Sequence, residues 1–365
     1  MMKKLAVIST VLIFSLVLFS SCAKKPSAPK AGSTKVDDML SLIPSDVQGV
    51  LFIDFHKAIT TELAEKALKD EKTRKKYQEF IDETGIDLKK DLFFVAGALS
   101  KGMGKEEQKG AFILNLRYDK ETFLNKIKKG GELKEEDYNG ITLFSAGEEE
   151  EWTGAFLDDS NLIAGSENEV KSVIDTYQQK SENVFQNENL AAIIDQTNKE
   201  ALFWAAFLIP AEAAKQVSAQ NPMLKNLESI KAANLSFDYK NKNLIAEIKV
   251  MSGDETKNQE IVDLLKGFKA MGVMAAAEDP DVSELLSKIE ITSEGGLQRD
   301  MRIERGKRKR NLFRIIFGFL IPDKGKRMKK TEEITLKQAH VKIYAKIPEE
   351  LINRLTEKKE KESNF

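Results

Sequence analysis

The stretch GVLFIDF, Gly49 to Phe55, is the starting point for the fold. It is a short apolar run with β-branched residues, which is typical of a buried strand. A second run of this kind, ALFWAAFL, extends from Ala201 to Leu208. Each run opens a similar predicted order of a strand, a helix, two strands, a helix, further strands and a final helix. The order predicts a duplicated unit.

Further predicted strands alternate apolar and polar residues. They cover residues 91–99, 111–118, 141–145, 152–157, 162–164, 234–239, 244–250, 288–292 and 341–346. Such alternation favours a mainly antiparallel sheet with one face covered by helices. We expect Asp54 and Asp238 to lie at a strand edge or to face solvent. The predicted fold class is α+β: a duplicated unit of mainly antiparallel sheet covered by helices, preceded by a signal helix and a flexible linker.

Several predicted helices have recognisable ends. One helix is expected over residues 57–84, and Gly85 is placed to end it. Ser166 and Glu169 have the spacing of a capping box at the start of another helix. The sequence KNKN between the strands 234–239 and 244–250 indicates a hairpin turn.

Length and composition bound the class of protein. The chain has 365 residues, a formal net charge of −1, 32% charged and 41% hydrophobic residues. This composition is typical of globular proteins. We divide the chain into a signal peptide (1–21), a linker (22–36) and two α+β domains (37–185 and 186–365). The second domain carries an insertion at 297–339.

The first 22 residues have the pattern of an export signal. Lys3 and Lys4 precede an apolar run over residues 5–19, which is shorter than the roughly 18 to 20 residues that span a bilayer. Small residues then lead to Cys22, the single cysteine of the chain, so an internal disulfide is excluded. The following residues are rich in Pro, Ala, Ser and Lys, which predicts an extended linker.

The sequence Phe19-Ser20-Ser21-Cys22 resembles the lipobox of bacterial lipoproteins. The family usually has Leu where this chain has Phe19. The resemblance implies cleavage before Cys22, lipid such as palmitate on that residue, and anchoring to a membrane of the cell envelope. Ala23 after the cysteine implies the periplasmic side of the outer membrane if the host is Gram-negative. The alternative is a free cysteine after ordinary signal cleavage.

The mature part is similar to exported α+β families of unknown function. The matching residues are three Ile-Pro pairs, at Ile43-Pro44, Ile209-Pro210 and Ile347-Pro348, and the turn YNGITLF at 138–144. This resemblance implies no activity.

Residues 297–339 separate two segments that would otherwise form a hairpin. The chain has ten arginines, and seven of them lie between Arg299 and Arg327. A dense apolar stretch, LFRIIFGFLI, begins at Leu312. Basic charge beside Phe, Ile and Leu is typical of an interfacial membrane segment. The candidate membrane-contact residues are Arg299, Arg302, Arg305, Lys307, Arg308, Lys309, Arg310, Phe313, Phe317 and Phe319.

Other interpretations of this segment remain open. It is also compatible with a disordered insertion, an extra helix packed on the body, or a misread or inserted piece of gene. An anionic lipid or an envelope polymer is the expected partner of residues 297–330 if the segment makes contact. Nucleic acid is not an expected partner, because the export signal argues against it.

The sequence shows no catalytic constellation. His56 and His340 are the two histidines, and neither has a His, Cys or carboxylate neighbour at metal-ligand spacing. The HExxH, GxSxG, P-loop and EF-hand patterns are absent from the sequence. We therefore expect no cofactor, no metal and no enzymatic activity.

The leading hypothesis is a lipoprotein tethered through Cys22, with a binding or scaffolding role and an unknown protein partner. One alternative is a carrier with an apolar pocket for lipid or another small apolar ligand. The third is an enzyme that uses scattered carboxylates. The 20 phenylalanines fit either a Phe-rich core or a lipid cavity.

Overall fold

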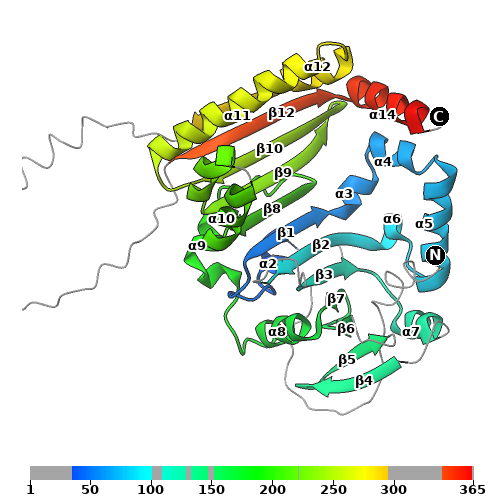
Figure 1. Ribbon diagram of the computed structural model, residues 1–365. Helices are drawn as coiled ribbons and strands as arrows, with labels where there is room; N and C mark the ends of the chain where they lie inside the picture. Colours follow the sequence, from blue (N-terminus) through cyan, green and yellow to red (C-terminus); the bar gives the residue numbers. More distant parts are fainter. Residues whose placement is uncertain are drawn as a thin grey trace, which may run out of the picture.

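One twelve-stranded sheet organises the part of the chain that the structure describes (Figure 1). The structure is a computed structural model and describes residues 35–100, 109–128, 133–146, 152–220, 222–294 and 339–363. The strand order is β11-β12-β10-β9-β8-β1-β2-β3-β7-β6-β5-β4, and the paired neighbours are antiparallel. The predicted α+β class with an antiparallel sheet is confirmed. The predicted signal helix and most of the linker lie outside the described residues.

The strands are β1 (Gly49–Asp54), β2 (Leu92–Leu99), β3 (Gly110–Leu116), β4 (Leu133–Tyr138), β5 (Ile141–Ala146), β6 (Thr153–Phe156), β7 (Asn161–Gly165), β8 (Phe203–Leu208), β9 (Ala232–Lys240), β10 (Asn243–Met251), β11 (Ile289–Glu294) and β12 (His340–Pro348). The helices are α2 (Val36–Leu40), α3 (Phe55–Ile59), α4 (Glu62–Ala67), α5 (Glu71–Thr84), α6 (Leu88–Asp91), α7 (Lys120–Lys128), α8 (Glu167–Tyr177), α9 (Glu188–Ile194), α10 (Ala211–Gln220), α11 (Glu255–Ala275), α12 (Pro280–Ser287) and α14 (Glu349–Ser363), with 3₁₀ turns η2 (Val184–Gln186) and η3 (Pro222–Ser229).

The two predicted halves meet at the pairing of β1 with β8. Val50 pairs with Ala206, and Phe52 pairs with Trp204. From this seam, β1-β2-β3 run outward on one side and β8-β9-β10 on the other, in the same chain order. On each side a helix follows, and a later strand then pairs with the third strand: β7 with β3, and β12 with β10. The β4–β5 hairpin occurs in the first half alone among the described strands, and the boundary at 185/186 falls within η2.

One face of the sheet, here called the α8 face because α8 packs on it, carries Val50, Phe52 and Trp204. The Phe52 and Trp204 rings stack with centroids 5.7 Å apart across the seam. Helices α2, α8 and α9 pack apolar side chains on this face. Phe52 and Trp204 are almost wholly buried, so each contributes about 3–5 kcal/mol by the cost of its truncation to alanine.

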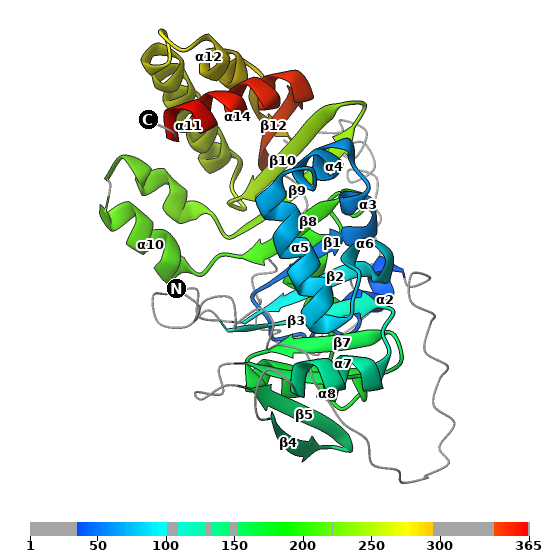
Figure 2. The same ribbon diagram turned by 90° about the vertical axis from the view of Figure 1, so that its right-hand side faces the viewer.

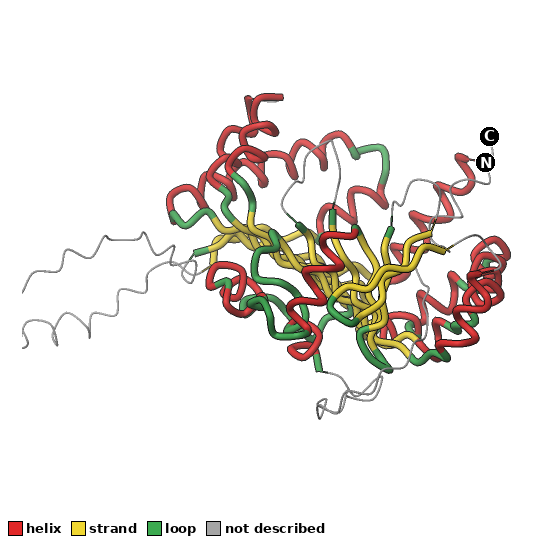
Figure 3. Tube along the Cα trace, turned by 90° about the horizontal axis from the view of Figure 1, so that it is seen from below, coloured by secondary structure: helices red, strands yellow, loops and turns green. Residues whose placement is uncertain are grey.

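The opposite face, here called the α11 face, holds two further apolar clusters. In the first half α7 packs Phe123 and Leu124 against Leu116 and Leu162. In the second half α11 packs Ile261 and Val262 against β10, β11 and β12. Helices therefore lie on both sides of the sheet, as Figure 3 shows. The expectation of a single covered face was wrong, because each half supplies helices to both faces: α8 and α7 in the first half, and α9 and α11 in the second.

The helix expected over residues 57–84 is three helices, α3, α4 and α5. Thr61 and Asp70 interrupt it, since each has an extended backbone and its side chain accepts a hydrogen bond from a backbone N–H three residues later. Such N-caps compete with continued helix. Gly85 ends α5 in the left-handed region at φ 76°, as predicted. Figure 2 shows α5 lying in front of the sheet in that view.

Tight turns fix the strand register at two hairpins. Asn139 and Gly140 join β4 to β5 with φ values of 56° and 77°. Asn241 and Lys242 join β9 to β10 with φ values of 52° and 58°. Two consecutive residues at positive φ match the twist of antiparallel strands. The second turn confirms the hairpin predicted at KNKN.

Candidate functional site

The candidate residues predicted from sequence are beyond what the structure describes. Cys22 precedes residue 35, where the description starts. The possible membrane-contact residues, Arg299, Arg302, Arg305, Lys307, Arg308, Lys309, Arg310, Phe313, Phe317 and Phe319, lie between the described residues Glu294 and Ala339. What the structure does show is where this segment leaves and re-enters the fold.

The insertion starts and ends at neighbouring positions of the sheet. Strands β11 and β12 pair over six residues, from Ile289 with Ala345 to Glu294 with His340. The expected pairing of these two strands is therefore confirmed. Because Glu294 and His340 are directly opposite each other, the residues between them connect two ends that a short turn could join.

A charged cluster lies on the α8 face beside these ends. We call it the charged ladder: Glu247, Lys249, Glu294, His340 and Lys342. Nζ of Lys249 lies 3.0 Å from a Glu247 carboxylate oxygen. Nζ of Lys342 lies 3.4 Å from Glu247 and 3.2 Å from Glu294. The His340 Nε2 atom lies 3.7 Å from Glu294 and is buried without a hydrogen-bond partner.

Burial and neighbouring charges set the pKa values in the charged ladder. Burial lowers the pKa of His340, and the positive charge of Lys249 lowers it further. Burial would raise the pKa of Glu247, but hydrogen bonds and charges from Lys249 and Lys342 outweigh it and hold the pKa below its usual range. The ladder is thus a largely compensated ion-pair network with a neutral histidine at its end.

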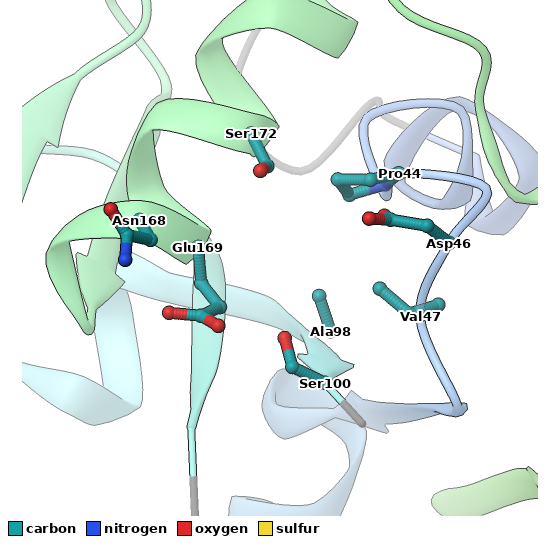
Figure 4. Close-up of a pocket in the computed structure, with 8 residues that line it drawn as sticks. All are labelled: Pro44, Asp46, Val47, Ala98, Ser100, Asn168, Glu169 and Ser172. Atoms are coloured by element: carbon teal, nitrogen blue, oxygen red, sulfur yellow. The ribbon is translucent and has the colours of Figure 1, made fainter. Parts of the chain in front are cut away.

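A separate pocket of about 290 Å³ lies at the start of α8. Figure 4 shows its lining residues: Pro44, Asp46 and Val47 before β1, Ala98 and Ser100 at the end of β2, and Asn168, Glu169 and Ser172 on α8. Val47 and Ala98 are buried and form an apolar wall. Among the lining residues that the structure describes, the charged side chains are those of Asp46 and Glu169, and both are acidic.

Glu169 does not play the role that its spacing predicts. Ser166 is the N-cap of α8, but its side chain makes no capping hydrogen bond. The Oε2 atom of Glu169 is buried and has no hydrogen-bond partner. The capping-box prediction was therefore wrong, because the Glu169 side chain lines the pocket. The sequence motif identified this residue and misassigned its contact. The other lining residues come from distant segments without a shared spacing signal.

The two acidic strand residues do not face solvent as expected. Asp238 is 3% exposed because β9 is an interior strand, and its carboxylate oxygens lie 2.5 Å from Lys240 Nζ and 3.7 Å from Lys57 Nζ. Asp54 is half-buried and caps α3 by accepting a hydrogen bond from the Lys57 N–H. Both prediction errors have one cause, because ion pairs and caps allow carboxylates inside the fold.

Glu349 joins the two halves at the first turn of α14. It is 5% exposed and accepts hydrogen bonds from Lys66 on α4 and from the hydroxyl of Tyr239 on β9. These bonds hold the pKa of Glu349 below its usual range. Burial and the bonded carboxylate of Glu349 raise the pKa of Tyr239 to about 12. The contacts are those of a structural brace.

His56 lies on the surface of α3. Its ring centroid is 5.6 Å from that of Phe93, and the residue is exposed. Among the described residues, no group of three or more His, Cys, Asp or Glu side chains is placed to hold a metal ion. Within the same part of the chain, no helix has the length and apolar character needed to cross a membrane.

Comparisons with known proteins give a family match and distant structural similarity. Residues 117–283 match a family model described as "Protein of unknown function (DUF3352)". The match begins after β3 and ends within α12, so it covers parts of both halves. No curated protein sequence matches the chain.

Solved structures of one protein are similar to this chain over much of its length. "Structure of crystal form III of TP0453" has 11% identity and a TM-score of 0.40, covering 63% of this chain and 86% of that chain. "Structure of crystal form IV of TP0453" has 10% identity and a TM-score of 0.36, covering 59% and 80%. Sequence identities and TM-scores this low give no information about function. The chain is similar, over residues 117–283, to a family of unknown function.

Proposed function

We propose that this protein is an envelope lipoprotein anchored by lipid on Cys22, and that its body binds or scaffolds another component without catalysing a reaction. The observation that carries the proposal is the position in the sequence at which the packed body begins, shortly after Cys22. Helix α2 starts at Val36 and places Met39 and Leu40 at zero exposure in the core. A short spacer therefore separates Cys22 from the packed body, which is the arrangement that a lipid tether needs.

A second membrane contact through residues 297–339 is part of this proposal. The pairing of Glu294 with His340 supports it, because the segment can leave the sheet edge without breaking the β11–β12 ladder. Each Lys or Arg near an anionic surface adds about 1 kcal/mol of attraction at low screening. Two or more acyl chains already give stable anchoring, so this contact would act in addition to the tether.

The experiment compares four forms of the full chain: wild type, Cys22→Ala, a form with residues 295–339 replaced by Asn-Gly, and the combination. Asn-Gly is chosen because this pair already closes the β4–β5 hairpin. Intact mass and membrane partition are measured for each form. We expect acyl mass on wild type and its absence in Cys22→Ala. Absence of acyl mass on wild type, or equal membrane partition of the two forms that lack residues 295–339, would contradict the tether. Membrane retention that disappears only in the combined form would support the second contact.

The electrostatics of two carboxylates of the body are consistent with the proposed non-enzymatic role. A catalytic acid or base is expected to have a pKa moved toward neutrality. Glu247 and Glu349 are instead held below their usual range by lysine partners. A purified body that hydrolyses an envelope ester or polymer, with loss of activity in His56→Ala, would contradict this part of the proposal.

An apolar-ligand carrier is the second candidate, and a strip on the α11 face favours it. The central strip consists of Leu51, Ile53, Phe112, Phe203, Phe207, Leu235 and Phe237 on adjacent strands around the seam. Each of these side chains keeps some exposure, and Phe237 is 37% exposed. The rings of Phe203 and Phe237 lie 5.9 Å apart. Exposed apolar area of this kind is a common feature of binding surfaces.

Titration with a fluorescent fatty acid distinguishes the carrier from a scaffold. If the strip binds acyl chains, Phe237→Glu should weaken binding at least about tenfold. Met274→Glu is the matched control, because Met274 is 77% exposed on α11 and is not part of the strip. Equal weakening by both substitutions, or no saturable binding, would contradict a carrier.

A further inference from the structure

Helix α11 carries an exposed apolar surface on the side that faces away from the sheet. Its residues Ile261 and Val262 pack toward the sheet, and Figure 1 shows the helix at the margin of the molecule. Further along the helix, Met271 is 51% exposed and Met274 is 77% exposed. Three of the five large apolar side chains that are exposed in the described part of the chain belong to α11. Exposed apolar area that is concentrated in one place is typical of an interaction surface.

The exposed residues have the spacing of a helix-packing seam. Along α11, intervals of three, four and three residues connect Leu264, Gly267, Met271 and Met274. Positions with this spacing lie along one face of a helix and are the contact positions of a coiled coil. Among the described residues, none outside the helix lies within 4 Å of the place that a Cβ on Gly267 would occupy, so another helix can approach its backbone closely. We call these four residues the α11 seam.

Charged residues border the α11 seam and limit what can cover it. Lys257 and Glu260 lie in the turns before it, and the Lys257 Nζ atom is 2.7 Å from a Glu260 carboxylate oxygen. Asp263 is exposed beside the seam, and Glu278 is exposed in the turn that follows α11. An anionic lipid surface would be repelled by these three acidic side chains, which favours a protein as the occupant.

A second copy of the chain complements the α11 seam when the two helices run antiparallel. With Gly267 of one copy opposite Met271 of the second copy, Leu264 lies opposite Met274, because both pairs share one centre along the helix. The Met271 side chain then fills the open space over Gly267. A two-fold axis at this centre makes each of these contacts occur twice. Small and large apolar residues therefore match each other within a single surface.

The charges at the two ends of the seam also match in antiparallel order. Glu278 of one copy then lies near the Lys257–Glu260 pair of the second copy, and the Lys257 ammonium group is a partner for both carboxylates. Parallel order would bring Glu278 beside Glu278 and Lys257 beside Lys257, which the repulsion of like charges disfavours. The end charges therefore select the antiparallel order.

We propose that two copies of this chain associate through the α11 seam, with the two helices antiparallel. The contact of one helix pair is small, so we expect a weak, reversible dimer with a Kd of roughly 1–100 μM. The proposal is independent of the lipid tether and of the central strip.

Sedimentation equilibrium of the full chain in density-matched detergent micelles tests the association. The chain carries Cys22→Ala, so that lipid on Cys22 cannot bring two copies into one micelle. We expect the average mass to rise from that of a monomer to that of a dimer as the protein concentration passes through the expected Kd. A chain that remains monomeric at about 300 μM would overturn the proposal.

Substitutions in α11 separate the seam from the rest of the helix. Gly267→Lys should weaken the dimer at least about tenfold, because it blocks the close approach while raising the helix propensity of an exposed position. Met271→Glu should weaken it by a similar factor, since it places a charge against Gly267 of the second copy. Val273→Glu is the matched control, because Val273 is 36% exposed on the same helix but lies outside the seam. Equal weakening in this control would contradict a contact through the seam.

A charge exchange tests the antiparallel order. Lys257→Glu should weaken the dimer about fivefold, because the acidic side chains at each end lose their partner. Adding Glu278→Lys should restore the affinity, since the new ammonium group would again meet Glu260 of the second copy. Failure to restore it would rule out antiparallel packing. Vesicles of phosphatidylglycerol and phosphatidylethanolamine test the alternative: flotation that disappears in Met271→Glu would assign the seam to a membrane and overturn the proposal.

Discussion

The two halves of the sheet share their strand order but differ on the α8 face. In the first half, Ala96 pairs with Phe52 and Ile113 pairs with Ala96, and all three are buried. In the second half, the same steps outward from Ala206 on β8 reach Asn234 and then Lys249. Ile113 packs under α8, whereas Lys249 pairs with Glu247 and donates to the Gln196 carbonyl at 2.9 Å.

The two halves therefore share their strand pairing although the side chains on the α8 face differ. Backbone pairing requires the same strand positions in both halves, and it does not require the same side chains. An apolar position needs a helix over it, and α2, α8 and α9 provide that cover at the seam and in the first half. A polar position needs partners, which the charged ladder provides in the second half.

Exchanging the matched residues is the strongest way to break the comparison. Ile113→Lys should lower the free energy of unfolding by about 4 kcal/mol or more, because an unpaired ammonium enters an apolar site. Lys249→Ile should lower it by about 1–2 kcal/mol, since Glu247 keeps Lys342 as a partner. Urea unfolding followed by circular dichroism measures both changes. Equal losses would show that the two positions are not chemically distinct.

Glu349 tests how strongly the halves are joined. Its pKa is lowered in the folded state by the bonds from Lys66 and Tyr239, so the unfolded chain binds more protons in acid. The stabilisation is therefore present above the ordinary carboxyl pKa of 4.5 and is lost as the pH falls through the lower folded value. Glu349→Gln should flatten the stability profile between about pH 6 and pH 3.

Urea unfolding at a series of pH values measures this effect. Glu350→Gln is the control, because Glu350 is the exposed neighbour in the same first turn. A profile that is unchanged in Glu349→Gln, or flattened equally in both variants, would remove Glu349 as the link.

His340 tests the charged ladder of the second half. Burial and Lys249 lower its folded pKa, so protonation favours the unfolded chain. Its contribution is fully present above the ordinary histidine value of 6.5 and is lost as the pH falls through the lower folded value. His340→Gln should reduce the loss of stability between pH 7 and pH 5 in urea unfolding. An equal reduction in His56→Gln, at the exposed histidine of the first half, would contradict this assignment.

The smallest expected changes in the free energy of unfolding come from substitutions in the two hairpin turns. Lys242 holds φ at 58° without the freedom of glycine, whereas Gly140 holds φ at 77° in the β4–β5 turn. Lys242→Gly should raise the free energy of unfolding by a few tenths to about 1 kcal/mol, and Gly140→Ala should lower it by roughly 1 kcal/mol. Opposite signs in thermal unfolding would confirm that both turns depend on positive φ; the same sign would contradict it.

Sequence patterns predicted the strands better than the helices and the site. Alternation identified β9 and β10, because a side chain on a strand has only two directions. The pattern missed β4, because this edge strand has the sequence LKEEDY, in which apolar and polar residues do not alternate. It also merged α3, α4 and α5, because the caps at Thr61 and Asp70 compete with apolar spacing.

The candidate pocket was beyond sequence reasoning for a different reason. Asp46, Ser100 and Glu169 come together only after β1, β2 and α8 have packed. Glu169 alone carried a local signal, and that signal predicted a cap. The carboxylate of Asp238 was misplaced because its burial depends on the interior position of β9 in the sheet, between β8 and β10. Local patterns cannot report contacts that depend on tertiary packing.

The seam between β1 and β8 has a consequence for the order in which the chain can fold. Strand β1 is made early, but the partner for one of its two edges arrives only when Phe203 to Leu208 have been synthesised. Until then, β1 presents unpaired backbone N–H and C=O groups, which invite pairing with another chain. A nascent chain that ended before β8 would therefore have a bare central edge and tend to associate with its own copies. Once β8 has been synthesised and has paired with β1, this edge is no longer available for pairing with another chain.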